Sequence, residues 1–133
     1  MSVYVLDACA ILAALRNEPG ADRVRAVLAS RETVLLGAIN ALEVIYDHWR
    51  MHGETTARRL LADIEQWNLL LIQDLSDDVL LSAARFKSRG RLSLADACAL
   101  ALAEVNKGIL VTADHHEFDP LEQAGLARFH WIR

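Results

Sequence analysis

Short apolar runs alternate along this chain with longer segments in which apolar residues recur at helical spacing. The short runs are rich in Val, Leu and Ile, as is typical of strands that are buried on both faces. The predicted strands are 3–6, 33–36, 69–72 and 109–112, with 129–132 as a candidate fifth strand at an edge. The predicted helices are 8–16, 21–30, 40–51, 55–67, 76–88 and 93–106. This alternation predicts an α/β fold of three layers, α/β/α, around a mostly parallel sheet of four to five strands.

Two acidic residues directly follow predicted strands. Asp7 closes the run 3–6, and Asp114 follows the run 109–112. In an open parallel sheet the carboxyl ends of the strands meet at one edge, where ligands bind. Each acid also has a purely structural explanation, because Asp7 can cap the next helix and Asp114 can start a turn. The two explanations do not exclude each other.

Two further acids lie near the start of predicted helices. Glu43 comes three residues after Asn40, and Asp96 comes three residues after Ser93. This spacing is that of a capping box, although Asp is shorter than the usual Glu. Four carboxylates at one sheet edge would repel one another unless a hard cation neutralised them. The joint pattern of Asp7, Glu43, Asp96 and Asp114 therefore predicts a Mg²⁺ site, with Mn²⁺ as a substitute, for phosphodiester hydrolysis.

Composition places limits on these interpretations. The chain has 133 residues and is 53% hydrophobic, which fits a single domain over residues 1–133. No apolar run approaches the roughly 20 residues of a membrane helix, and no signal peptide is recognisable, so we expect a cytoplasmic protein. Its two cysteines cannot form a disulfide framework. The net charge of −4 gives no global attraction to nucleic acid, so a nuclease would need a local basic patch.

The densest basic stretch precedes the predicted helix of Asp96. It consists of Arg85, Lys87, Arg89 and Arg91. Cations at the end of a helix complement its dipole, and they also bind RNA phosphates. Arg89 and Arg91 flank Gly90, which makes them the best candidates for RNA binding. Thr112 is a third candidate, because its hydroxyl lies two residues before Asp114.

Three residues after Asp114 are weaker candidates for the same site. Asp119 is either a fifth acid that reaches a metal through water or the start of a turn before Pro120. His115 and His116 are either general bases or ordinary surface residues, and Mg²⁺ prefers oxygen ligands to imidazole.

The segments that carry the four acids also resemble the PIN domain, in sequence and in order. These segments are VYVLDACAIL, INALEV, RLSLADACALALA and ILVTADHHEFDPL. The resemblance spans nearly the whole chain, and small members of this kind are typically the ribonuclease toxins of VapBC toxin–antitoxin pairs. It implies a Mg²⁺-dependent endoribonuclease whose acidic residues are Asp7, Glu43, Asp96 and Asp114. It also implies a homodimer and a small antitoxin whose tail covers the active site.

One departure from the family pattern lies next to the first acid. The family usually has Ser or Thr one or two residues after it, whereas this chain has Ala8 and Cys9. A thiol is a poor partner for Mg²⁺, so the contacts with substrate are left open. The alternative function is a catalytically inactive PIN-like module that only binds RNA or a protein. The sequence contains no motif that indicates which RNA is cut.

Overall fold

The computed structural model describes residues 1–133, which form a five-stranded sheet in which every neighbouring pair is parallel. The strand order is β3-β2-β1-β4-β5. The strands are β1 (Val3–Leu6), β2 (Thr33–Gly37), β3 (Leu70–Ile72), β4 (Ile109–Thr112) and β5 (Phe129–Trp131). The order reverses between β1 and β4, and such a reversal marks the crevice where open α/β sheets bind ligands. The predicted α/β fold is confirmed, with a sheet that is wholly rather than mostly parallel.

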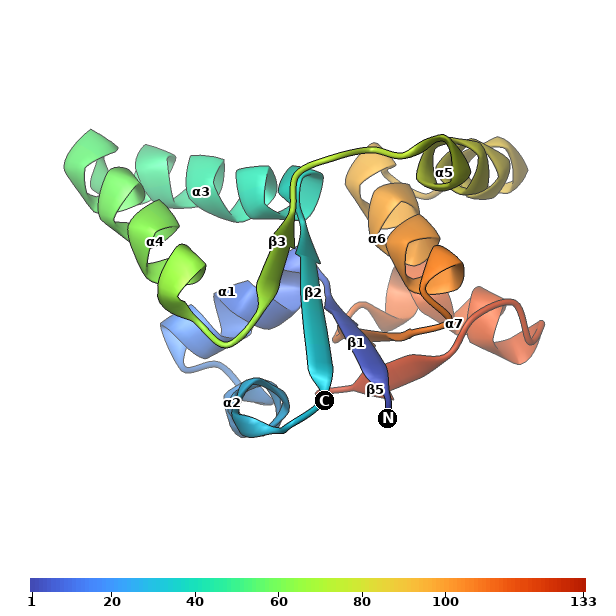
Figure 1. Cartoon of the computed structure of the whole chain (residues 1–133), viewed down its shortest axis with the longest axis horizontal. Helices are drawn as coiled ribbons and strands as arrows, with labels where there is room; N and C mark the ends of the chain where they lie inside the picture. The colour runs from blue at the N-terminus through green and yellow to red at the C-terminus, as the bar shows by residue number, and fades with distance from the viewer.

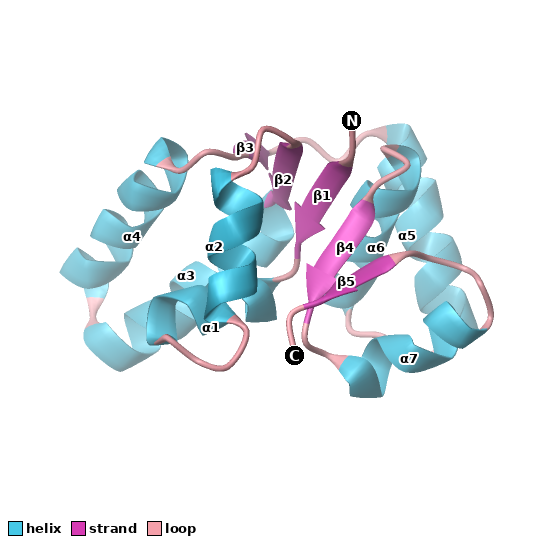
Figure 2. Ribbon diagram, turned by 90° about the horizontal axis from the view of Figure 1, so that it is seen from below, coloured by secondary structure: helices cyan, strands magenta, loops and turns pink.

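Seven helices cover the two faces of the sheet. One layer contains α1 (Ala8–Arg16), α2 (Ala21–Ala29), α3 (Ala38–His52) and α4 (Glu54–Gln66). The other contains α5 (Asp77–Arg89), α6 (Leu94–Val105) and α7 (His115–Gln123). In Figure 1 the sheet is seen nearly edge-on, with α1–α4 to its left and α5–α7 to its right. Figure 2 shows the same separation from below.

The apolar strands fill two cores, one on each face of the sheet. Leu6, Leu36 and Val111 belong to the core beneath α1–α4. Their neighbours along the strands, which include Val5 and Leu110, belong to the core beneath α5–α7. Successive side chains of a strand point to opposite faces, so a strand between two helical layers must be apolar at every position. This requirement explains the continuous apolar runs in the sequence. No helix is both long and apolar enough to span a membrane.

Two predictions about secondary structure were wrong. Helix α3 begins at Ala38 rather than at Asn40, and its N-cap is Gly37. Helix α7 was not predicted, because its segment contains two histidines and Pro120 and has only Phe118 and Leu121 as large apolar residues. A signal for it existed, however. Asp114 accepts a hydrogen bond from the Glu117 N–H, so the Asp-x-x-Glu spacing marked a helix start.

Candidate active site at the carboxyl ends of the strands

Asp7 lies at the end of β1, beside the point where the strand order reverses. Its side chain is only 2% exposed. The Ala8 N–H donates to Oδ1 at 2.8 Å, and the Thr112 hydroxyl donates to Oδ2 at 2.9 Å. Burial raises the pKa of Asp7 despite these hydrogen bonds, and the nearby charge of Asp114 adds to the effect. Asp7 therefore caps α1 as predicted and is also an electrostatically costly buried acid.

Thr112 joins Asp7 to Asp114. It is fully buried, and its hydroxyl both donates to Asp7 and accepts the Asp114 N–H at 3.1 Å. The Thr112 side chain has no exposed surface, and its contact with RNA stays a prediction. Its role is to position the two acids that follow β1 and β4.

Cys9 lies against the same group of atoms. Its Sγ is 3.4 Å from Asp7 Oδ2 and 3.3 Å from Thr112 Oγ1, and it accepts the Ala113 N–H at 3.4 Å. Burial and the charge of Asp7 raise the pKa of Cys9 to about 12. The residue is thus a neutral thiol that supports Asp7, in a position where the family usually has a hydroxyl.

Asp96 approaches the other acids from the first turn of α6. The Ser93 hydroxyl accepts the Asp96 N–H at 3.1 Å, which confirms the predicted helix start. Burial raises the pKa of Asp96 to about 7, and the charges of Asp7, Asp114 and Glu43 contribute. The backbone of Asp96 takes part in capping, whereas its carboxylate faces a concentration of negative charge.

Glu43 is placed by a buried turn of α3. The capping box predicted with Asn40 is wrong, because Asn40 lies inside the helix, is 1% exposed and donates through Nδ2 to the Ala95 carbonyl at 3.2 Å. The Glu43 carboxylate makes no hydrogen bond with the protein. Burial raises its pKa, followed by the charges of Asp7 and Asp47. Glu43 therefore does not cap a helix.

The four acids form an unpaired anionic site. None of them has a salt bridge to Lys, Arg or His, although the chain contains other ion pairs. No three acidic, histidine or cysteine side chains are already arranged as a metal-binding group. Mg²⁺ characteristically uses one or two protein carboxylates and keeps several water ligands, so all-oxygen donors that do not form a closed cage fit that ion.

The basic stretch divides into two functional halves. Arg85 forms a salt bridge with Glu104, and Lys87 Nζ donates to the Leu92 carbonyl at 2.6 Å. Arg89 and Arg91 make no hydrogen bond or salt bridge with the protein and are exposed. The first pair stabilises the α5–α6 region, whereas the second pair remains available to a ligand.

The weaker candidates on α7 turn away from the four acids. His115 Nδ1 is 2.8 Å from Asp119 Oδ1, and His115 Nε2 is 2.8 Å from the Arg133 carbonyl oxygen. The His115 ring stacks on Trp131 with 3.8 Å between centroids. Asp119 does not contribute to the raised pKa of Asp7, Glu43 or Asp96. His115 and Asp119 thus tie α7 to β5, and His116 lines a separate cavity.

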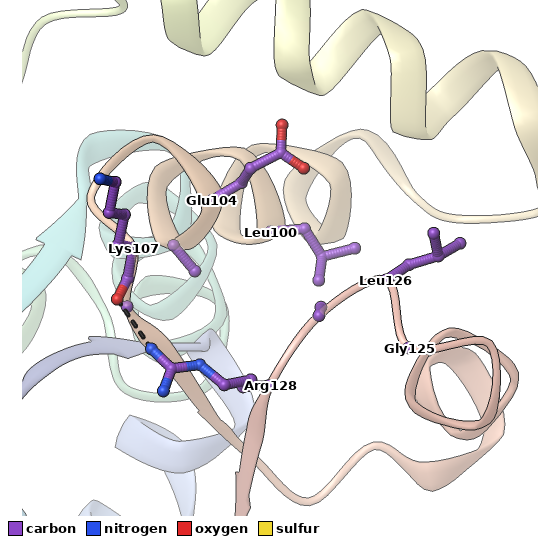
Figure 3. Close-up of a pocket in the computed structure, with 9 residues that line it drawn as sticks. Leu100, Glu104, Lys107, Gly125, Leu126 and Arg128 are labelled. Atoms are coloured by element: carbon purple, nitrogen blue, oxygen red, sulfur yellow. Dashed lines mark hydrogen bonds between the residues drawn. The ribbon is translucent and has the colours of Figure 1, made fainter.

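Two cavities lie on the α6 side of the molecule, and Leu126 lines both of them. One, of about 260 Å³, lies at the amino ends of the strands, where Arg128 donates to the Lys107 carbonyl (Figure 3). The other, of about 420 Å³, lies between the α5–α6 loop and α7. The first has an ion-paired acid, Glu104, in its wall. None of the four acids lines either cavity, but the second is lined by Glu117, whose N–H donates to Asp114 Oδ1.

The match to a family model identifies the class of protein. The PIN domain model matches residues 4–122, so the chain belongs to the PIN domain family. No curated protein matches it in sequence.

Solved structures of toxin–antitoxin proteins share this fold. The DNA-bound VapBC from Salmonella typhimurium superposes with a TM-score of 0.77 at 14% identity, over 100% of both chains. VapBC-1 from nontypeable Haemophilus influenzae gives 0.75 at 16% identity, over 98% of both chains. VapC20 from Mycobacterium tuberculosis, described as a Sarcin-Ricin loop cleaving toxin, gives 0.63 at 19% identity, over 82% of this chain and 87% of that one. The family and fold inferred from the sequence are confirmed.

Proposed function

We propose that this protein is a Mg²⁺- or Mn²⁺-dependent endoribonuclease and the toxin of a toxin–antitoxin pair. The observation that carries the proposal is the anionic site at the strand-order reversal, where burial and mutual repulsion raise the pKa of three carboxyls and no cation of the protein pairs with them. Such a site is unfavourable for folding alone and favourable for binding a divalent cation. Membership of the PIN family and the RNA-cleaving VapC20 among similar structures support the choice of RNA.

The four carboxylates would hold the metal ion and the attacking water molecule in fixed positions. Asp7 and Asp114, joined by the Thr112 hydroxyl, would present oxygen ligands from the ends of β1 and β4. Asp96 would complete the ligand set from α6, directly or through water. Glu43 makes no hydrogen bond with the protein, so it is free to orient a water molecule toward the phosphorus. A bound Mg²⁺ or Mn²⁺ would supply a lowered water pKa and stabilisation of negative charge on the phosphate oxygens.

Arg89 and Arg91 would hold the RNA backbone beside this site. Their guanidinium groups are unpaired, and the loop that carries them leads into the first turn of α6, where Asp96 lies. Changing both to Ala should reduce the slope of log K against log salt by about 1.4, because two fewer counterions of a single strand are released. Arg59→Ala on α4 is the control, and an equal change in that variant would contradict the assignment.

A partner protein would bind near the site. Leu42, Tyr46 and Trp49 lie on one face of α3 at helical spacing and are 57%, 52% and 46% exposed. Exposed apolar patches of this kind are typical of protein interfaces. We therefore include a small antitoxin, like those in the similar VapBC complexes, and a homodimer in the proposal. Light scattering of the purified protein, alone and co-expressed with the adjacent small reading frame, tests both.

Cleavage of single-stranded RNA tests the enzymatic proposal. Wild-type protein should cleave with Mg²⁺ or Mn²⁺ and not with EDTA. Asp96→Asn and Glu43→Gln should each lose about a thousandfold in rate, equivalent to roughly 4 kcal/mol of transition-state stabilisation. Full activity in both variants would falsify the proposed role of these residues and favour the inactive RNA- or protein-binding module.

Two controls separate catalysis from folding. Asp63→Asn removes an exposed acid of α4 and should leave cleavage unchanged. Ser93→Ala removes the hydroxyl that accepts the Asp96 N–H, so it should lose about 1 kcal/mol of stability yet keep most activity at low temperature.

A further inference from the structure

The cavity between the α5–α6 loop and α7 combines an apolar floor with a charged rim. Its volume is about 420 Å³, within the range of small-molecule sites. The floor consists of Phe86, Leu92, Leu121 and Leu126. The loop side of the rim carries Arg89 and Arg91, and the α7 side carries Glu117. Donors therefore face the cavity from one wall and an acceptor faces it from the other.

Two short backbone segments connect the walls of this cavity to the elements that carry Asp96 and Asp114. Arg91 and Leu92 immediately precede Ser93, whose hydroxyl accepts the Asp96 N–H. On the other side, the Glu117 N–H donates to Asp114 Oδ1 at 3.2 Å. A nucleotide in the cavity would therefore lie beside the starts of α6 and α7, which carry Asp96 and Asp114.

The Glu117 carboxylate is available to a ligand because its usual partner is already taken. Glu117 is three residues after the helix cap Asp114, and in a capping box its carboxylate would accept the Asp114 N–H. Here the Thr112 hydroxyl accepts that N–H at 3.1 Å instead. Glu117 consequently makes no side-chain hydrogen bond or salt bridge with the protein. Its half-buried carboxylate lines the cavity without a partner.

We propose that this cavity is a guanine-binding subsite that fixes where the RNA is cut. The inference rests on the proposed function and deepens it. Guanine places two adjacent donors, N1–H and N2–H₂, on one edge and two acceptors, O6 and N7, on another. The donor edge matches the Glu117 carboxylate, and the acceptor edge matches a guanidinium of the opposite wall, since Arg pairs with O6 and N7.

The other three bases fit the carboxylate less well. Adenine and cytosine place an acceptor nitrogen beside their amino group, and uracil places a carbonyl on each side of its single N–H. Each of these acceptors would meet a Glu117 oxygen and be repelled. The apolar floor contacts every base equally, and the two arginines also hold the RNA backbone in the proposed function, so discrimination between the bases falls on Glu117.

Binding in EDTA tests the subsite independently of cleavage. The probes are fluorescent uridine oligomers with a single central guanosine, inosine, adenosine, cytidine or uridine, measured by anisotropy at fixed salt. We expect the guanosine oligomer to bind about tenfold more tightly than the adenosine, cytidine and uridine oligomers, which is in the lower part of the range for one well-placed bidentate pair. Inosine lacks the 2-amino group and should fall between guanosine and uridine.

Glu117→Gln should remove the discrimination but not the binding. Gln offers one acceptor and one donor group, so the guanosine preference should fall to twofold or less, and the difference between guanosine and inosine should disappear. Affinity for the plain uridine oligomer should stay equal or rise slightly, because a negative charge is lost. Glu65→Gln, a matched change at an exposed position of α4, should keep the full preference.

The outcomes distinguish this inference from the proposed function. Equal binding of all five oligomers by a protein that cleaves RNA would overturn the guanine subsite alone. A preference that survives in Glu117→Gln would overturn it as well, and so would failure to bind any oligomer. A guanosine preference that depends on Glu117 in a protein that does not cleave RNA would support the subsite while the nuclease proposal failed.

Discussion

The two ends of the parallel sheet differ in whether their acidic side chains are paired with basic ones. At the carboxyl ends, four acids approach one another with no cation, and burial and repulsion raise the pKa of Asp96 to about 7. At the amino ends, Glu104 binds Arg85 and accepts from the Ser82 hydroxyl at 3.1 Å, and the pKa of Glu104 is lowered. A fold under selection for stability alone would pair both sets of charges. The difference supports the metal-binding role proposed for the carboxyl end, whereas the ion pair at the amino end contributes to stability.

A bound divalent cation should neutralise the acids at the carboxyl end and stabilise the folded protein. Mg²⁺ or Mn²⁺ at about 100 times its dissociation constant should stabilise the folded protein by roughly 2.7 kcal/mol. Thermal unfolding with the metal and with EDTA, at matched ionic strength, measures this. The gain should be much smaller in Asp96→Asn, and equal midpoints for wild-type protein in the two buffers would rule the metal site out.

Removing the Thr112 hydroxyl, which connects Asp7 to Asp114, should destabilise the carboxyl end of the sheet. Thr112→Val deletes the donor to Asp7 and the acceptor of the Asp114 N–H, so we expect a loss of about 2 kcal/mol in metal-free urea unfolding. Thr33→Val, at an exposed position of β2, should change stability by less than about 0.5 kcal/mol. Comparable values for the two variants would mean that Thr112 does not organise the acids.

The pH dependence of metal-free stability should report Asp96. Its folded pKa of about 7 lies above the ordinary value of 3.8, so the folded state binds more protons between these values. Its stabilising contribution is therefore fully present below about pH 4 and is lost as the pH rises through about 7. Because Asp96 is partly open to solvent, screening limits the effect to about 1–2 kcal/mol. Asp96→Asn should flatten the urea-unfolding profile over this window, and an unchanged profile would exclude the shift.

Breaking the ion pair at the amino end should have the smallest effect. Glu104→Gln should cost no more than about 1 kcal/mol, because the Arg85–Glu104 pair is largely exposed. The cost should shrink in high salt. Neither the stabilisation by Mg²⁺ nor RNA cleavage should change. A lost metal response in this variant would show that the two ends are not independent.

Much of the fold and of the candidate site could be predicted from local pattern. The runs 3–6 and 109–112 were apolar at successive positions, which is the requirement for a strand between two helical layers. The positions of those strands predicted that Asp7 and Asp114 lie at the carboxyl edge of the sheet. The preference of Ser for the first position before a helix predicted the start of α6 at Ser93. The helix at 115–123 was missed because its segment contains two histidines and Pro120, and because its packing depends on the contact of Phe118 with Phe129 of β5.

Other features depended on contacts between distant segments. Asn is a residue type that often caps helices. Asn40 instead lies inside α3, where its side-chain amide donates to the carbonyl of Ala95, 55 positions away. Thr112 was predicted to contact RNA, and the sheet places its side chain on Asp7, 105 positions away. Cys9, predicted only as a departure from the family pattern, became a neutral thiol because it is buried beside that same acid.

The sequence by itself determined the class of fold, the family and the four acids, because strand burial, helix capping and the order of the motifs are local properties. Only the tertiary structure decided which polar groups are satisfied. It paired Arg85 and Lys87 and left Arg89 and Arg91 free, and it gave the Asp114 N–H to Thr112 so that Glu117 kept an unbound carboxylate. The physical reason is that a hydrogen bond or a pKa depends on distances across the fold, which residue spacing does not specify.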